Sequence, residues 1–407
     1  MSLVLDISRT VARARLPQPT GIDRVERAYV DWALQRDALF LALIDRRFYL
    51  LEPPVVRTLI TWLDGQGEAP ARDWRATLHP RRDRRLGQAQ SLIRRGAVET
   101  LGSVPGLSDV LRARLPGGGV YLNVGHDNLS VPVMRALGAA GLARVVLIHD
   151  TIPLDHPEFA RKGTPEKFRQ KLDAALEADL ILVNSRDTQE RIAGHAGGRT
   201  PRTVVAPLGI DLPGKPVRPS EQEKPYFVCL GTIEPRKNHA LLLDLWGQMA
   251  DRAPAELHIV GRRGWENAQV FETLDTASFM GRRVFELGAI PEEAACARIA
   301  GARALLFPSH AEGYGLPLAE ALSLGCPVIA SDLPALREVG GDVPEWLPPG
   351  DARGWRDVIE AYAHKDSPER AAQMDRLRHW RPPSWADHFA IVDKHLETIL
   401  VQSGAGG

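Results

Sequence analysis

The chain of 407 residues is longer than one ordinary domain, and this length favours two or three domains. Apolar residues make up 44% of the chain and charged residues 25%, a balance typical of a globular protein, which excludes a disordered chain. The 51 basic and 51 acidic residues cancel, so no overall field attracts nucleic acid or an anionic membrane, and no apolar run reaches the ~18 residues that span a bilayer.

Strands and helices alternate through the first half of the chain, as in a parallel, right-handed β-α-β sheet. The opening is a short apolar strand, a loop with glycine and an amphipathic helix. It lacks Gly-x-Gly-x-x-Gly, which disfavours a nicotinamide or flavin enzyme. We expect strands at 2–7, 120–124, 144–148 and 180–183, two strands joined by a turn within 38–51, and helices near 22–33, 130–140 and 165–177.

Arginine is concentrated in residues 64–100. Within 72–95 there are eight arginines and two acidic residues, with Trp74, Leu92 and Ile93 interleaved. Two interpretations stay open. The segment is either a basic amphipathic region that touches anionic lipid or a lipid-linked acceptor, or a solvated insertion, and the second is favoured.

Two of the expected strands run into a histidine, at His126-Asp127 and at His149-Asp150. Ligands of parallel α/β sheets bind beyond the carboxyl ends of the strands, so these residues are candidates for a site. A histidine at a strand end is more often structural than catalytic, and both interpretations stay open.

A run of Pro, Lys, Glu and Ser up to Pro225 predicts an exposed linker, after which a second domain begins. Its first strand, 226–231, leads to Arg236 and Lys237 at the entrance of a helix near 241–246. The arginine fork can bind a diphosphate bidentately and the lysine adds a point charge, although a plain charged turn is the alternative. Further strands are expected at 257–261 and 284–287, and helices at 355–363 and 385–400.

The cysteines Cys229, Cys296 and Cys326 stand apart in apolar contexts and lack the spacing of metal ligands. We expect core residues of a reduced compartment. The sequence therefore predicts a cytoplasmic protein, whose contact with a membrane would be peripheral and at the inner face.

The segment 310–327 carries the most specific chemistry. The apolar run 302–307 predicts a strand that breaks into a loop with Glu312 and two glycines, and the next helix places Glu320 about one turn from its start. Glycines let the backbone approach a ligand, and free amides at a helix start favour an anionic group. Carboxylates on both sides suggest a hydroxyl-rich ligand that carries phosphate. The alternative is a solvated loop residue and a charge favoured by the helix dipole.

The run Glu-Gly-Tyr-Gly-Leu-Pro-Leu-x-Glu in 312–320, the trailing Gly-Cys-Pro-Val-Ile-Ala-Ser and the later Leu336-Arg337-Glu338-Val339 resemble the Glu-x7-Glu region of the retaining glycosyltransferases of family four. The resemblance implies an α/β protein with the GT-B fold, in which two Rossmann-like domains face each other and the last helix crosses back to the first domain. The expected domains are 1–213, with the basic insertion at about 64–100, 214–384, and a returning helix and tail at 385–407.

The same resemblance implies roles for individual residues. Glu312 would bind hydroxyls of the donor sugar, and Glu320 would bind the ribose diol of the nucleotide. His149-Asp150-Thr151-Ile152-Pro153 resembles the family's His-Asp-x-Ile-Pro segment, whose histidine faces the donor sugar, and Lys237 matches the lysine that binds the donor phosphates.

Many family members carry arginine where this chain has Thr232, so Arg236 or Arg262 would supply the missing charge. The predicted catalytic residues are Glu312, His149, Lys237 and Arg236; the donor-binding residues are Thr20, Gly21, Asp150, Gly231, Thr232, Arg262, Ile290, Gly313, Tyr314, Gly315, Leu316 and Glu320; the acceptor-side residues are His126 and Asp127; and no metal ligand is expected.

These observations predict a retaining, metal-independent glycosyltransferase without a cofactor. It would move a hexose from a nucleotide-diphosphate sugar, with GDP-mannose favoured, to a saccharide or lipid-linked acceptor in cell-surface polysaccharide synthesis. A glycoside hydrolase is disfavoured, because a hydrolase has no use for the basic diphosphate cluster. An eight-residue helical separation would also place the two carboxylates ~12 Å apart, more than the ~5 to 9.5 Å of hydrolase pairs, although Glu312 itself lies in a loop. A nucleotide-sugar epimerase on the same fold and a non-catalytic sugar-nucleotide-binding protein remain alternatives.

Overall fold

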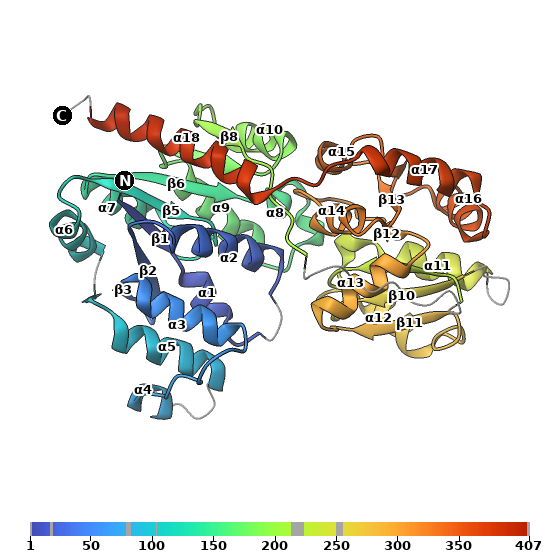
Figure 1. The fold of residues 1–407 in the computed structure, drawn as a ribbon, viewed down its shortest axis with the longest axis horizontal. Helices are drawn as coiled ribbons and strands as arrows, with labels where there is room; N and C mark the ends of the chain where they lie inside the picture. The colour runs from blue at the N-terminus through green and yellow to red at the C-terminus, as the bar shows by residue number, and fades with distance from the viewer. Residues whose placement is uncertain are drawn as a thin grey trace.

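The computed structural model describes residues 2–16, 19–78, 83–102, 104–212, 224–249 and 255–404, and each of its two α/β domains is built on its own sheet (Figure 1). The predicted linker, with the expected boundary between 213 and 214, falls on residues outside the described ones, and so do Arg81 and Arg82 of the basic insertion.

The first sheet has eight strands in the order β4-β3-β2-β1-β5-β6-β7-β8. β2 pairs with β3 and β3 with β4 in antiparallel fashion, and the other neighbours are parallel. Central strands such as β7 are apolar and buried throughout, as expected where helices cover both faces of a sheet. The strands are β1 (Leu3–Asp6), β2 (Ala38–Ile44), β3 (Arg47–Leu51), β4 (Glu99–Leu101), β5 (Gly119–Asn123), β6 (Leu142–Ile148), β7 (Leu180–Val183) and β8 (Thr203–Val205).

The second sheet has six parallel strands in the order β11-β10-β9-β12-β13-β14. Its strand order reverses between β9 and β12, as the first sheet's order does between β1 and β5. Ligands bind at such reversal points, outside the carboxyl ends of the strands. The strands are β9 (Tyr226–Leu230), β10 (Glu256–Val260), β11 (Val284–Gly288), β12 (Leu305–Phe307), β13 (Val328–Ser331) and β14 (Glu345–Leu347).

Helices connect the parallel strands and cover the faces of both sheets (Figure 1). In the first domain they are α1 (Ser8–Arg13), α2 (Gly21–Ala33), α3 (Pro53–Leu63), α4 (Trp74–Leu78), α5 (Arg84–Gly96), α6 (Val104–Arg114), α7 (Val131–Ala139), α8 (Ile152–Asp155), η1 (Pro157–Phe159), α9 (Thr164–Ala175) and α10 (Arg186–His195). In the second part of the chain they are η2 (Pro235–Lys237), α11 (His239–Met249), α12 (Ala268–Thr276), α13 (Glu292–Gly301), α14 (Leu316–Ser323), α15 (Pro334–Gly340), α16 (Ala352–Ala363), α17 (Pro368–His379) and α18 (Trp385–Gly404).

The last helix, α18, leaves the second domain and lies along the first (Figure 1). His388 Nε2 and the Tyr29 hydroxyl of α2 are 2.8 Å apart, and Phe389 stacks on Trp32 with 5.2 Å between the ring centroids. Val392 is fully buried beneath this contact. The predicted crossing of the last helix is therefore confirmed.

The two chain segments that pass between the domains touch each other. The backbone N–H of Ile210 donates to the carbonyl of Pro383 at 3.1 Å. A Cβ atom on Gly209 would lie 2.3 Å from the backbone nitrogen of Trp385, so only glycine fits at this position.

Most predicted elements are present with bounds that differ by a few residues, and β7 agrees at both ends. The apolar run 302–307 differs more, because only its second half is strand. Ala302 still belongs to the end of α13, where its N–H donates to the carbonyl of Ile299 at 3.1 Å.

Candidate functional site

A buried charge cluster lies at the reversal point of the second sheet. The loop after β9 leads into η2, which supplies Arg236 and Lys237, and the loop after β12 supplies Glu312. One carboxylate oxygen of Glu312 is 3.0 Å from Arg236 Nη1 and the other is 2.5 Å from Lys237 Nζ. Three residues that the sequence analysis assigned to catalysis therefore contact one another.

The cluster favours the ionised form of Glu312. Burial alone would raise the pKa of Glu312, but the charges of Arg236 and Lys237 outweigh burial and lower this pKa from 4.5 to about 2. Burial lowers the pKa of Lys237, although Glu312 opposes the change. Arg236 also pairs with Glu234 at 2.8 Å and donates to the carbonyl of Ala311 at 2.7 Å. A bound diphosphate would compete with Glu312 for the two cations.

The glycine loop before α14 packs against the strand end that carries His149 and Asp150. A Cβ atom on Gly313 would lie 2.5 Å from the carbonyl oxygen of His149, so this close approach requires glycine. The Ser185 hydroxyl donates to the carbonyl of Gly313 at 2.9 Å. These contacts join the two domains directly beside Glu312.

Three further predicted donor-binding residues lie along the same loop and the start of α14. Gly315 is the N-cap of α14 with φ of 97°. The Tyr314 hydroxyl donates to the carbonyl of Leu208 at 2.7 Å, so it holds the segment between the domains. Leu316 approaches α2, since a Cβ atom on Gly21 would lie 3.2 Å from its Cδ1.

Both strand-end histidines are buried and held by strand carbonyls. His149 Nε2 donates to Val124 and His126 Nε2 donates to Leu147, each at 2.8 Å, and the ring centroids are 5.0 Å apart. Burial lowers the pKa of His149 from 6.5 to about 4 and that of His126 well below its ordinary value. Both rings are therefore neutral at pH 7, and one nitrogen of each serves the fold.

The other predicted residues have varied surroundings. Asp127 is 3.8 Å from Lys171 Nζ. Burial raises the pKa of Asp150, which caps the N–H of Ile152 at 3.1 Å. The Thr20 hydroxyl donates to Asp23 at 2.7 Å and so serves the start of α2.

Four predicted residues lie in the loops that follow β9, β10 and β11. Gly231 follows β9 and lies beside the aliphatic part of the Lys237 side chain. A Cβ atom on Gly231 would be 3.4 Å from Lys237 Cε. Thr232 packs near Gly264, Arg262 is exposed and Ile290 is half-buried.

Glu320 is paired with a residue of the other domain. Arg24 of α2 donates through Nη1 to Glu320 Oε1, and its Nη2 lies 3.5 Å from Glu292 Oε1. Burial raises the pKa of Glu320, and the Arg24 charge opposes this. The pairing of Arg24 with Glu320 could not be read from the sequence, because the two partners are 296 positions apart and no local pattern connects them.

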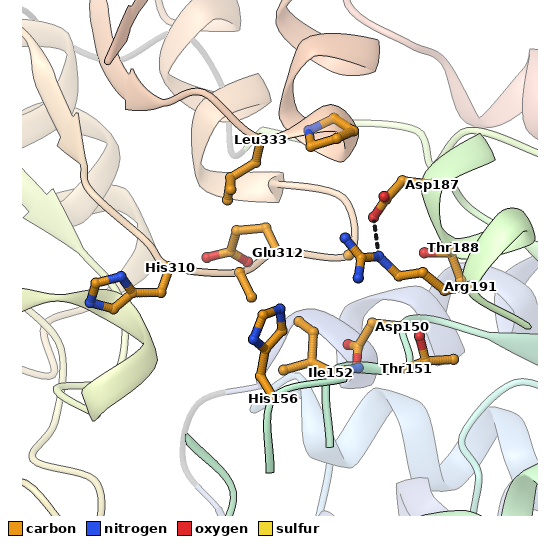
Figure 2. A pocket seen from close by; sticks show the side chains of 13 residues that line it. Asp150, Thr151, Ile152, His156, Asp187, Thr188, Arg191, His310, Glu312 and Leu333 are labelled. Carbon is orange, nitrogen blue, oxygen red and sulfur yellow. Dashed lines mark hydrogen bonds and ion pairs between the residues drawn. The ribbon is translucent and has the colours of Figure 1, made fainter. Parts of the chain in front are cut away.

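A cavity of about 230 Å³ adjoins Glu312 and is lined by both domains (Figure 2). Arg191 and Asp187 of α10 form an ion pair of 2.8 Å at its edge. The sequence analysis missed this wall, although α10 follows β7 at the same sheet edge as His149. The lining residues are Asp150, Thr151, Ile152, His156, Asp187, Thr188, Arg191, His310, Ala311, Glu312, Gly313, Leu333 and Pro334.

Glu338, part of the motif that carried the resemblance, also contacts the other domain. Its carboxylate accepts hydrogen bonds from the backbone N–H groups of Arg186 and Asp187, at 2.7 and 2.9 Å. These are the first amides of α10, where a negative charge is favoured. Glu338 therefore anchors α15 to α10 across the domain boundary.

Within the described ranges, no three or more His, Cys, Asp or Glu side chains are grouped so that they could hold a metal ion. None of the helices in the described part of the chain is long and apolar enough to cross a membrane.

The second domain is similar in sequence to known proteins. Residues 215–376 match the family model described as Glycosyl transferases group 1. The serotype-specific mannosyltransferase WbdA of Escherichia coli is 30% identical over 269 residues, which cover 58% of this chain and 32% of WbdA. The O-antigen chain mannosyltransferase B of Escherichia coli is 30% identical over 231 residues, 54% of this chain and 59% of that protein. The matched part of the chain thus spans 32% of the length of WbdA and 59% of the length of the O-antigen chain mannosyltransferase B.

Solved structures show the same fold over nearly the whole chain. Alr3699/HepE of Anabaena in complex with UDP aligns with a TM-score of 0.64 and 18% identity, covering 97% of this chain and 98% of that one. The lipopolysaccharide outer core galactosyltransferase WaaB aligns with a TM-score of 0.58 and 17% identity, covering 98% and 99%. The predicted fold class, two Rossmann-like domains in the GT-B arrangement, is confirmed. Residues 215–376 are thus similar to the glycosyl transferases group 1 family, and the chain as a whole has the GT-B fold.

Proposed function

We propose that the protein is a retaining, metal-independent glycosyltransferase that uses a nucleotide-diphosphate sugar. The cluster of Glu312 with Arg236 and Lys237 carries this proposal, because it puts two cations and a carboxylate beside the start of α14 at a sheet reversal point. Cations and helix amides suit a diphosphate, and a carboxylate suits sugar hydroxyls. The donor would lie between the domains, where closure excludes water and limits hydrolysis.

The leaving diphosphate gains negative charge in the transition state, and Arg236 and Lys237 would stabilise it there. They would also take the role that a divalent ion has in other transferases. Glu312 would turn from the cations to the hydroxyls of the sugar. Neutral His149 would position the sugar, and Glu320 the ribose. Retention of anomeric configuration rests on the Glu-x7-Glu resemblance.

The relatives favour mannose as the transferred hexose and GDP-mannose as the donor, since WbdA and the O-antigen chain protein are named mannosyltransferases. Their names also favour an acceptor in cell-surface polysaccharide synthesis, either a saccharide or a lipid-linked precursor. The cavity beside Glu312 is smaller than the ~300 to 1,000 Å³ of pockets that enclose a drug-sized ligand. The cavity would hold one sugar ring, either that of the donor or that of the acceptor.

The basic insertion would meet a membrane that carries the acceptor, from the cytoplasmic side. Trp74 and Leu78 of α4 are each 67% exposed, and Arg75 lies 5.2 Å from the Trp74 ring. An exposed apolar pair one helical turn apart, flanked by arginine, suits the interface of an anionic bilayer. Arg94 would not contribute, because it is buried and paired with Asp73 at 2.5 Å.

A screen of ligands and products tests the reaction class. GDP, UDP, GDP-mannose and UDP-glucose are added to the protein, and a ligand at 100 times its dissociation constant should stabilise the fold by ~2.7 kcal/mol. Transfer of the hexose to a saccharide acceptor supports the proposal. An isomerised donor formed without acceptor would identify an epimerase, and donor binding with no product would identify a binding protein.

Two variants test the assignment of the carboxylates. Glu320→Ala should weaken binding of the free nucleoside diphosphate by roughly ten- to a hundredfold, because a hydrogen bond to a charged group contributes ~1.5 to 3 kcal/mol. Glu312→Ala should not weaken that affinity, because Glu312 competes with the diphosphate for Arg236 and Lys237, and it should lower turnover, because the contacts with the sugar are lost. Equal losses of affinity in both variants would contradict these roles.

A further inference from the structure

One side chain of the first domain reaches the second domain at the carboxylate assigned to ribose. Arg24 donates to Glu320 of α14, lies 3.5 Å from Glu292 of α13, and donates to the backbone carbonyl of Asp211 at 3.3 Å. It therefore connects α2, the segment that leaves the first domain, and two helices of the second. The Glu320 side chain is 9% exposed and that of Arg24 is 29% exposed, so water screens this pair only in part.

The start of α2 holds Arg24 in a fixed direction. The Thr20 N–H and hydroxyl both donate to Asp23, at 2.8 and 2.7 Å, which fixes the first turn of the helix. Arg9 of α1 binds the same carboxylate at 2.7 Å. Since Gly21 also packs near Leu316 of α14, the helix start and the arginine approach the second domain together.

The ribose diol and Arg24 would both bind the carboxylate oxygens of Glu320. A carboxylate that accepts from a guanidinium has fewer acceptor positions left for two hydroxyls. Glu320 projects from α14 against Arg24 of α2 and its side chain is 9% exposed, so a ribose that binds this carboxylate would have to displace Arg24. In the part of the chain that the structure describes, Arg24 is the cation of the first domain that pairs with Glu320 of the second.

We propose that Arg24 is an interdomain latch, which closes the cleft on Glu320 in the free protein and is displaced when the ribose of the donor binds. The proposal rests on the ribose role proposed for Glu320. Breaking the latch consumes part of the free energy of nucleotide binding, so the observed affinity is lower than that of a protein in which Glu320 is accessible. Release of Glu320 from Arg24 and binding of the donor ribose are thereby coupled through one side chain.

Calorimetry with GDP and UDP on Arg24→Met tests the competition. Methionine retains much of the apolar stem but has no charge, so the nucleoside diphosphate should bind roughly tenfold more tightly than to the wild type, the equivalent of one charged hydrogen bond. Inorganic pyrophosphate, which has no ribose, should bind both proteins equally. Arg24→Lys, which keeps a charge without the fork, should be intermediate and provides a second variant if methionine impairs folding.

Arg27→Met is the matched control on the same helix. Arg27 pairs with Asp31 at 2.9 Å and Asp64 at 2.6 Å, both in the first domain, so its loss should change neither nucleotide affinity nor domain opening. Small-angle scattering of the free proteins should show a larger radius of gyration for Arg24→Met than for Arg27→Met and the wild type.

The outcomes separate the latch from the donor assignment. Weaker or unchanged nucleotide binding in Arg24→Met, with pyrophosphate binding intact, would overturn the latch and make Arg24 a donor contact or a structural residue. If no variant and no wild-type protein binds GDP or UDP, the proposed function fails. The latch is then decided by scattering alone, and an unchanged radius of gyration overturns it.

Discussion

Replacing Glu312 by glutamine should destabilise the second domain by about 3 kcal/mol at pH 7. The substitution keeps the size of the side chain and removes its charge. Arg236 would retain Glu234 as a partner, whereas Lys237 would stay buried beside a neutral amide. The cations hold the pKa of Glu312 at about 2 instead of 4.5, and at ~1.36 kcal/mol per pKa unit this depression is equivalent to about 3 kcal/mol. Breaking buried ion pairs elsewhere costs ~3 to 5 kcal/mol.

The loss should depend on pH in a defined direction. The folded pKa of Glu312 lies below its ordinary value, so its contribution to the free energy of unfolding is complete above pH 4.5 and disappears as the pH falls through about 2. The difference between wild type and Glu312→Gln should therefore be largest at pH 5 to 7 and should shrink steadily at lower pH.

Urea denaturation followed by tryptophan fluorescence measures this difference, because Trp246 and Trp355 are fully buried in the second domain. Asp357→Asn is the control. Asp357 lies 3.8 Å from Arg353 on the surface of α16, where both side chains are exposed, and its loss should cost less than ~1 kcal/mol. A Glu312→Gln protein as stable as the wild type at pH 7, or a loss that stays constant down to pH 3, would refute the reasoning.

Three further predictions concern activity and localisation. Hexose transfer should survive EDTA, because Arg236 and Lys237 supply positive charge at the diphosphate; activity that is lost on chelation and restored by magnesium would contradict this. Proton NMR of fresh product should show the anomeric configuration of the donor, and an inverted product would remove the family-four resemblance as a guide. The double variant Trp74→Ser, Leu78→Ser should sediment less with anionic vesicles, whereas unchanged sedimentation would leave the insertion as a solvated segment.

The elements that could be predicted from the sequence are those that depend on a local pattern of residues. Leu180–Val183 is apolar at every position and is a strand with these bounds, because a buried parallel strand needs no alternation. The loop with Glu312 follows from a strand, two glycines and a proline near a helix start. By contrast, α10 is mostly polar and buries only Thr188 and Ile192, so its sequence gives little helical periodicity.

What the sequence could not predict depends on contacts between distant residues. Arg24 is an ordinary basic residue of an amphipathic helix until α14 is placed against it. Glu338 belongs to a recognisable motif, but its function at the start of α10 requires the other domain. Arg94 looked like one of many surface arginines, and only the packing of α5 shows it buried on Asp73.

The contact between Ile210 and Pro383 has a mechanical consequence. The described residues 209–210 and 383–385 of the two connections between the domains meet at one place, where Gly209 packs against Trp385. A rotation of one domain against the other that keeps this contact must have its axis near that point. In such a rotation, displacement grows with distance from the axis, so a small change of backbone angle at 209–210 is amplified at the far end of the cleft.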